Sequence, residues 1–294
     1  MKQIKRGSWG VKVAPYLFLL PTMAIFAVFI YWPAIYGIFI SLTDSSGISK
    51  TVNFIGLQNY IRLFQDKAYW ATLWATTRYV LLVVPITFAV SLGIALLLNN
   101  LRGKGLWRAI IYWPAMISPL IVGLIWKWIF GDSLGIVNFL LQKLGLAPIK
   151  WLSQPGTALL CIIIAAVWTG VGVIMVMFIS GIKNIPEQYY EAAKIDGASA
   201  GQTFRRITFP LLKPTNVLVM ITLIIAAFKV YPLVNALTKG GPGNSTMFIV
   251  QYIYTYAFTR NKLGYASAMS LILFVVLGLL TVVQFKLTDG GEIK

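Results

Sequence analysis

The sequence predicts an all-α integral membrane protein with six membrane-spanning helices. Of its 294 residues, 58% are hydrophobic and only 11% are charged, and the mean hydropathy is +0.78. A water-soluble fold could not cover so much apolar surface with so few charges. The apolar residues gather in six runs, each at or near the length of about 20 residues that a helix needs to cross a bilayer.

The six runs define the expected spans in chain order. Five of the runs have an uncharged core. The remaining run, which is the fifth along the chain, is interrupted by Lys229. We expect the spans at residues 13–41, 76–101, 108–130, 157–182, 214–236 and 263–286. No internal repeat or low-complexity linker divides the chain, so we expect one domain over residues 1–294. The segment between the first two spans contains NYIRLFQDKAYW, which predicts a short amphipathic helix at the membrane interface.

The basic residues predict the orientation. With a cytoplasmic N-terminus, 14 of the 25 lysines and arginines fall in inner segments and 8 in outer segments, although the inner segments are together shorter. Arg78, Lys127 and Lys229 lie within the spans or at their ends. Cytoplasmic loops carry the excess of positive charge in membrane proteins, so we expect both termini to be cytoplasmic.

The composition argues against several functions. The chain has no histidine, a single Cys161 and no phosphate-binding loop, so we expect neither a metal centre nor a cofactor within it. All eight acidic residues fall outside the apolar runs, whereas a proton-coupled carrier places carboxylates at membrane depth. The net charge of +17 is scattered along the membrane flanks, which favours lipid headgroups over nucleic acid as its partner.

A polar segment at residues 184–213 separates the fourth and fifth spans. Its sequence, NIPEQYYEAAKIDGASAGQTFRRITFPLLK, predicts a helix after Pro186 that ends at Gly197, because glycine accepts the left-handed conformation of a helix C-terminus. Ser199 and Gln202 then fit the capping box of a second helix. We therefore expect a helical hairpin on the cytoplasmic face.

Alanines give this hairpin one small, smooth side, which suits insertion into a groove of another protein. They stand at positions 192, 193, 198 and 200. Composition alone is equally compatible with an amphipathic loop that lies on the lipid surface.

The hairpin also carries a motif. EAAKIDG, followed nine residues later by ITFP, resembles the EAA motif of the membrane subunits of binding-protein-dependent ABC importers, E-A-A-x-x-x-G-x9-I-x-L-P. The matching positions are Glu191, Ala192, Ala193, Gly197, Ile207 and Pro210, and Phe209 replaces the usual leucine. Three further stretches, which begin at Asn53, Arg102 and Leu237, are similar to the sugar-transporter branch of that family, which includes the maltose and glycerol-phosphate permeases.

The resemblance implies a type I ABC importer-like permease fold in a bacterial or archaeal cell membrane. The hairpin, with Asp196 among its coupling residues, would be seated in a cytoplasmic ATPase subunit. Family pattern further implies a second permease subunit, a dimer of ATPase subunits that binds ATP and Mg, and an extracytoplasmic solute-binding protein. The chain would supply half of the pathway for a saccharide or related polyol and would not itself be a catalyst.

In the resembled proteins, residues of the fourth and fifth spans line the pathway. The corresponding positions here are Trp168, Thr169, Gly170, Phe228, Lys229, Tyr231 and Asn235. Aromatic rings could stack on sugar faces, and the polar groups could bind hydroxyls. The simpler interpretation is that the aromatic residues anchor spans at the interface, that small residues pack helices and that Lys229 reaches water.

Two alternatives remain from the sequence. One is a self-sufficient secondary carrier or channel, against which the lack of intramembrane carboxylates and of an internal repeat counts. The other is an ABC permease for another small solute such as an amino acid.

Overall fold

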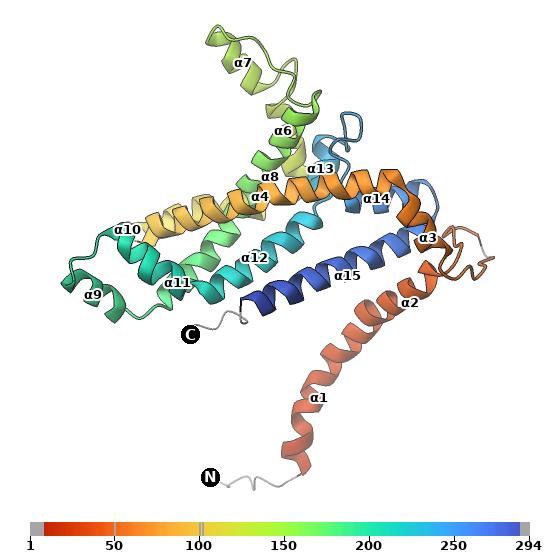
Figure 1. Cartoon of the computed structure of the whole chain (residues 1–294), viewed down its shortest axis with the longest axis horizontal. Coiled ribbons are helices and arrows are strands. Elements are labelled where there is room, and N and C mark those ends of the chain that lie inside the picture. Colours follow the sequence, from red (N-terminus) through yellow and green to blue (C-terminus); the bar gives the residue numbers. More distant parts are fainter. Residues whose placement is uncertain (1–8, 50, 100, 102, 289–294) are drawn as a thin grey trace. The chain divides into compact units, whose positions relative to one another are not determined.

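A computed structural model describes residues 9–49, 51–99, 101 and 103–288 of the chain, and within them the regular structure is helical (Figure 1). A single isolated bridge between Thr43 and Phe54 is the one β pairing in that part of the chain. The all-α prediction is confirmed. The terminal residues on which the expected orientation partly rests, Lys2, Lys5, Arg6 and Lys294, lie outside the described residues, as do Lys50 and Arg102.

The helices follow one another along the chain with short π or 3-10 turns between some of them. The α-helices are α1 (Trp9–Phe26), α2 (Trp32–Ser41), α3 (Gln58–Gln65), α4 (Lys67–Asn99), α5 (Lys104–Tyr112), α6 (Pro119–Ile129), α7 (Ile136–Lys143), α8 (Pro155–Lys183), α9 (Gln188–Ile195), α10 (Ala200–Thr203), α11 (Phe209–Leu211), α12 (Lys213–Phe228), α13 (Pro232–Leu237), α14 (Ile249–Tyr254) and α15 (Leu263–Leu287).

Four helical stretches in the described residues are long and apolar enough to cross a membrane: Val13–Ser41, α4, α8 and α15. Two bent helix pairs raise the number to six if each pair forms one span. The expected positions of the spans therefore agree with helices, but two of the six are not single helices.

The stretch expected as one span at residues 108–130 is bent by 96° between Lys104–Met116 and Pro119–Ile129. After a 3-10 turn that contains Pro114, Ile117 and Ser118 are extended, with ψ of 138° and 132°. Proline disfavours the α conformation in the residue before it and donates no hydrogen bond, so Pro119 begins a new helix.

The stretch expected at residues 214–236 is also divided. α12 ends at Phe228, and α13 begins at Pro232 after a backbone break in which Tyr231 has φ −142° and ψ −59°. A further bend of 70° separates Ala200–Leu211 from α12. Pro232, like Pro119, stands at the start of the helix that follows the break.

The chain divides into two compact units, residues 1–65 with 253–273 and residues 66–252 with 274–294. In the first unit, the buried Asn59 of α3 donates hydrogen bonds of 2.8 Å to the carbonyl oxygens of Ser41 and Thr43. The backbone N–H of Gly264 donates to Ser45. These bonds tie the end of α2 to α3 and to the start of α15. The single domain expected from the sequence stays a prediction.

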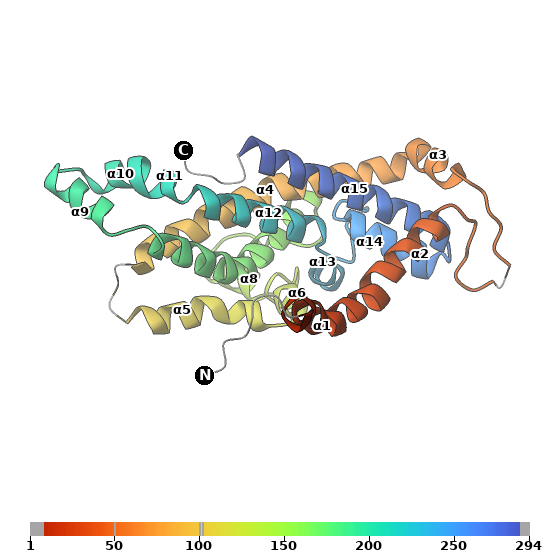
Figure 2. The ribbon, with the colours of Figure 1, turned by 90° about the horizontal axis from the view of Figure 1, so that it is seen from below.

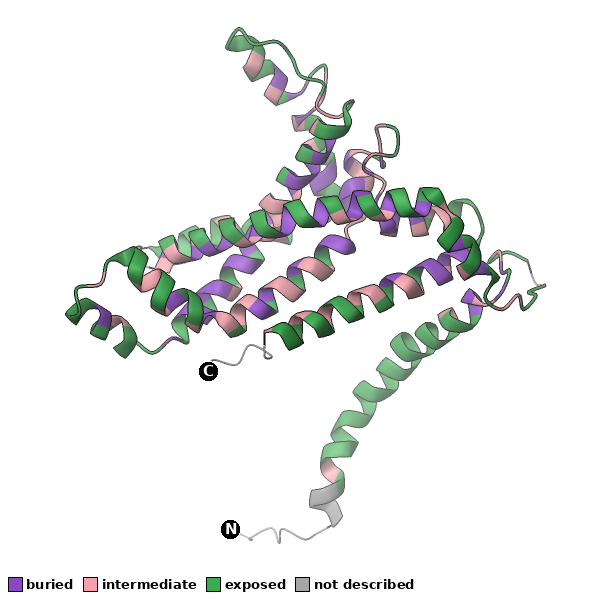
Figure 3. Cartoon of the chain, viewed as in Figure 1, coloured by how far each residue is buried: buried purple, intermediate pink, exposed green. Residues whose placement is uncertain are grey.

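In the second unit, α8 packs against α4, α5 and α12, and α6 packs against α13 (Figure 2). Buried side chains follow the inward faces of α4 and α8 and recur along α12 (Figure 3). The helices approach closely at glycines. A Cβ on Gly172 would lie 2.7 Å from the carbonyl oxygen of Ile111, and a Cβ on Gly123 would lie 2.6 Å from the side chain of Ala236. Small residues permit such backbone approach in membranes.

Candidate substrate pathway and coupling hairpin

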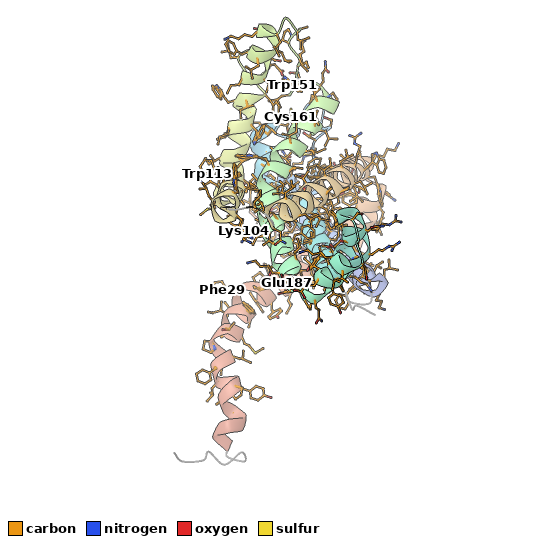
Figure 4. The ribbon with its side chains drawn as sticks, turned by 90° about the vertical axis from the view of Figure 1, so that its left-hand side faces the viewer. Phe29, Lys104, Trp113, Trp151, Cys161 and Glu187 are labelled. Carbon is orange, nitrogen blue, oxygen red and sulfur yellow. The ribbon has the colours of Figure 1, made fainter. Side chains whose placement is uncertain are left out.

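The polar hairpin has the helix–turn–helix form that its sequence predicts. α9 is followed by Gly197, whose φ of +68° is left-handed, and Ser199 caps α10 in a capping box with Gln202. The first helix begins at Gln188 with Glu187 as its N-cap, while Asn184 ends α8. Glu187 lies where the hairpin leaves the membrane helices (Figure 4).

Inner contacts hold the hairpin to its own base. Ala193 is buried, and its carbonyl oxygen accepts from the backbone N–H of Ala198 across the turn. The hydroxyl groups of Tyr190 and Thr208 lie 3.2 Å apart and join α9 to the segment that leads into α12. A cavity of about 620 Å³ lies behind the hairpin, between it and the inner ends of α4 and α8.

The remaining motif residues lie mostly on the outer face. Glu191, Ala192, Asp196 and Pro210 are exposed, whereas Ile207 is half-buried. Sequence reasoning missed Ile195, whose side chain is 86% exposed at the hairpin tip. The feature of the sequence that could have pointed to it is an isoleucine within an otherwise polar turn. Ile195 is the most exposed of the large apolar side chains of the hairpin.

A cavity of about 330 Å³ lies between α4, α6, α8, α12 and α13. It brings together four of the seven residues that were predicted to line the pathway: Thr169, Gly170, Lys229 and Tyr231. Lys229 is exposed at the C-terminus of α12 and is the one charged residue among the described residues that line the cavity. The helix break at residues 229–231 is thus part of the wall.

The other three predicted residues lie elsewhere. Trp168 packs edge-on against Trp126 at 5.7 Å between ring centroids and lines a different, apolar cavity. Phe228 is buried. The amide oxygen of Asn235 accepts a hydrogen bond of 3.4 Å from the side chain of Gln251.

Sequence reasoning missed the contribution of α4 and α6 to this cavity. Tyr79 and Thr87 of α4 line it, as does Pro119 at the start of α6. The Cγ2 atom of Thr87 would lie 3.4 Å from a Cβ on Gly170, so the two helices approach at this level. The feature of the sequence that could have pointed to α4 is the presence of Tyr79 and Thr87 within its apolar run.

The cavity offers phenol, hydroxyl and ammonium groups on an otherwise apolar wall, which is a lining for a small polar solute. The described residues contain no cluster of histidine, cysteine or carboxylate side chains that could hold a metal ion. The fold and the site thus define a helical membrane protein with a partly polar cavity and a projecting hairpin.

The comparisons with known proteins identify the family. Residues 85–290 match the family described as "Binding-protein-dependent transport system inner membrane component", and the chain belongs to this family. The trehalose/maltose permease MalF of Thermococcus litoralis is 34% identical over 92% of both chains. The sn-glycerol-3-phosphate permease UgpA of Agrobacterium fabrum is 32% identical over 95% of both chains.

Solved structures show the same fold. A bacterial ABC transporter that imports the acidic polysaccharide alginate has a chain that aligns with a TM-score of 0.82, at 24% identity, over 94% of this chain and 95% of that one. The family match makes the chain a non-catalytic permease component of a binding-protein-dependent ABC importer. It is a multi-pass inner-membrane protein of bacteria or archaea, and its homologues import sugars and glycerol 3-phosphate.

Proposed function

We propose that this permease supplies half of the translocation pathway for a saccharide or related polyol. The cavity between α4, α8 and the α12–α13 break carries the proposal, because it places hydroxyl groups and an aromatic ring around a space of about 330 Å³. Its lining has no carboxylate among the described residues and one cation, Lys229. The relatives that transport trehalose, maltose and glycerol 3-phosphate are consistent with polyhydroxylated cargo.

The coupling step of the proposal rests on the hairpin. Movement of a cytoplasmic ATPase subunit would act on the exposed face of Glu191, Ala192, Ile195 and Asp196 and pass through Thr208 into α12. ATP and Mg would be held by a dimer of those ATPase subunits and not by this chain. A second permease subunit would complete the pathway.

The outer side of the second unit offers a surface for a solute-binding protein. α7 projects beyond α6 and α8 (Figure 1), and the helix and its flanking residues expose large apolar side chains, among them Leu134, Phe139 and Leu144. Asn138 and Asp132 fix this segment through hydrogen bonds with the backbone at residues 149 and 152. We assign this segment to contact with the binding protein.

Coupling is tested by the substitution Gly197→Ala in the complete transporter reconstituted in vesicles. A Cβ at φ +68° strains the turn by about 1–2 kcal/mol and reorients the tip. We expect solute uptake per ATP hydrolysed to fall several-fold. The matched control is Gly201→Ala, because Gly201 lies in α10 and a Cβ there meets nothing within 4 Å. Normal coupling in Gly197→Ala would refute the assignment of the hairpin.

The cargo is tested by uptake of labelled sugars, polyols, sugar phosphates and amino acids. We expect ATP-dependent uptake of a polyhydroxylated compound, with an altered apparent affinity in Lys229→Gln. The control Lys127→Gln removes an exposed lysine from the last turn of α6, outside the cavity lining. Uptake without ATP in vesicles that hold this chain alone would favour a self-sufficient carrier, and preference for amino acids would refute the cargo class.

A further inference from the structure

A single cation lines the cavity between α4, α8 and the α12–α13 break, at the middle of the membrane helices. Thr169 stands midway along the 29 residues of α8. Lys229 follows the 16 residues of α12, which rise about 24 Å along the helix axis. Both residues line the cavity, and the side chain of Lys229 is exposed and accessible to a solute. An ionisable residue at such depth is costly and typically has a functional partner.

The cavity itself gives Lys229 no counter-ion. None of the described residues that line it carries a carboxylate. The backbone N–H of Lys229 donates to the carbonyl oxygen of Ile225, so the residue sits at the C-terminus of α12, where the helix dipole is negative. That dipole is equivalent to about half an elementary charge. A surplus of positive charge therefore remains in the wall.

The two threonines of the wall act as hydrogen-bond acceptors toward a solute. The hydroxyl group of Thr87 donates to the carbonyl oxygen of Val83 at 2.7 Å, and that of Thr169 donates to the carbonyl oxygen of Ala166 at 3.0 Å. Each hydroxyl has one hydrogen, so both oxygens have only acceptor capacity left. The hydroxyl groups of a solute can donate to them, while the ammonium group of Lys229 offers donors to an anion.

This division of donors and acceptors selects among solutes. A neutral sugar would satisfy the threonines and leave Lys229 without a counter-ion. An amino acid would place its own ammonium group in the same space as Lys229, without a carboxylate from the described lining to offset it. A solute with both hydroxyl groups and an anionic group satisfies the whole wall, and charge-assisted hydrogen bonds are the strongest that the wall can form.

We propose that the cargo is an anionic sugar or polyol whose carboxylate or phosphate group binds Lys229 while its hydroxyl groups donate to Thr87 and Thr169. This inference rests on the proposed function, because it concerns the cavity assigned there to the pathway. It narrows the cargo from saccharides and polyols in general to their acidic members.

The first test uses the unaltered transporter, complete in vesicles, and pairs of labelled solutes that differ by an anionic group. Glucose with glucuronate and galactose with galacturonate probe a carboxylate, and glycerol with glycerol 3-phosphate probes a phosphate. We expect ATP-dependent uptake of the acidic member of at least one pair to be about tenfold faster than that of its neutral member. The pair that responds distinguishes the two anionic groups.

The second test assigns this preference to Lys229. In Lys229→Gln, we expect uptake of the acidic solute at limiting concentration to fall about tenfold and that of its neutral counterpart to change less than about two-fold, because only the charge-assisted bonds are lost. Lys229→Arg keeps the charge and should retain most of the preference. The control Lys127→Gln removes an exposed lysine outside the cavity lining and should leave the preference unchanged.

Several results would overturn the inference. Equal or faster uptake of the neutral members, or no uptake of any acidic member, would do so while polyhydroxylated cargo still stands; uptake of amino acids alone would overturn the proposed function as well. A full preference in Lys229→Gln would mean that the anionic group is selected outside this cavity. Loss of the second permease subunit on purification of Lys229→Gln, but not of Lys127→Gln, would assign the counter-ion to that subunit instead of the cargo.

Discussion

Asn138 in the segment between α6 and α8 allows the clearest test of how the outer surface is built. This asparagine is 1% exposed. Its amide nitrogen donates to the carbonyl oxygens of Asp132 and Ile149 at 2.9 Å, and its oxygen accepts at 3.0 Å from the Ile149 N–H and the Trp151 indole. One side chain thus closes the segment from residue 132 to residue 151.

The substitution Asn138→Ala removes all four of these bonds. Each hydrogen bond contributes about 1 kcal/mol net, so the closed form of the segment loses about 4 kcal/mol of stability relative to the open form. Since 1.4 kcal/mol corresponds to a factor of ten, its open population rises by roughly two to three orders of magnitude. Proteolysis tracks the population of the open form when opening is fast compared with cleavage. We therefore expect a comparable rise in the rate of cleavage between residues 131 and 153.

The assay is limited proteolysis of the outer face of the reconstituted transporter, together with ATP hydrolysis with and without the binding protein. Stimulation by the binding protein should fall, and basal hydrolysis should stay unchanged. Gln142→Ala is the matched control, because it removes an exposed amide from the same short helix. A cleavage rate in Asn138→Ala equal to that in Gln142→Ala would refute the reasoning.

Three further predictions concern packing and capping. Gly264→Ala should lower the free energy of unfolding by about 1–3 kcal/mol, because the new Cβ would overlap the backbone carbonyl oxygen of Thr43. The control is Gly278→Ala in the same helix, where a Cβ meets nothing within 4 Å. Thermal unfolding in detergent compares the two variants. Thr76→Val should lower the free energy of unfolding by about 1–3 kcal/mol, because the buried N–H of Ile249 loses its acceptor at 2.9 Å. Thr76→Ser should restore most of this free energy in the same measurement. Ser199→Ala should destabilise the second helix of the hairpin by about 1 kcal/mol, seen as faster hydrogen exchange there, and unchanged exchange would contradict the role of the cap.

Features set by neighbouring residues could be predicted from the sequence. The hairpin has its expected form because Gly197 and Ser199 act within three or four residues of themselves, so local chemistry decides the turn and the cap. The end of α15 at Leu287 agrees with the expected span at 263–286. α4 begins at Lys67, nine residues before the expected start, because the side chain of Asp66 accepts from the N–H groups of its first turn.

The helix breaks could not be predicted from hydropathy. Pro85 stays within α4, whereas Pro119 and Pro232 each begin a helix after a break. Proline is tolerated inside membrane helices when neighbouring groups satisfy the backbone, so the outcome depends on packing from elsewhere in the chain. The apolar runs on either side of a break look continuous, which is why 108–130 and 214–236 each resembled one helix.

The cavity wall shows the same limit at longer range. Thr87 and Gly170 are more than eighty positions apart and meet only because α4 packs against α8. Trp168 is directed away from the cavity walls because it packs with Trp126, a partner that periodicity does not reveal. The family resemblance pointed to Thr169 and Lys229, which both line this cavity, and tertiary packing decided which other residues line it with them.

The cavity and the exposed tip of the hairpin are built from separate sets of residues. No described side chain belongs to both, although α8 and α12 lead from one to the other. Under the proposed function, substitutions in the wall would alter what is carried and leave the exposed face of the hairpin unchanged. A change of cargo would then require no change in the turn at Gly197.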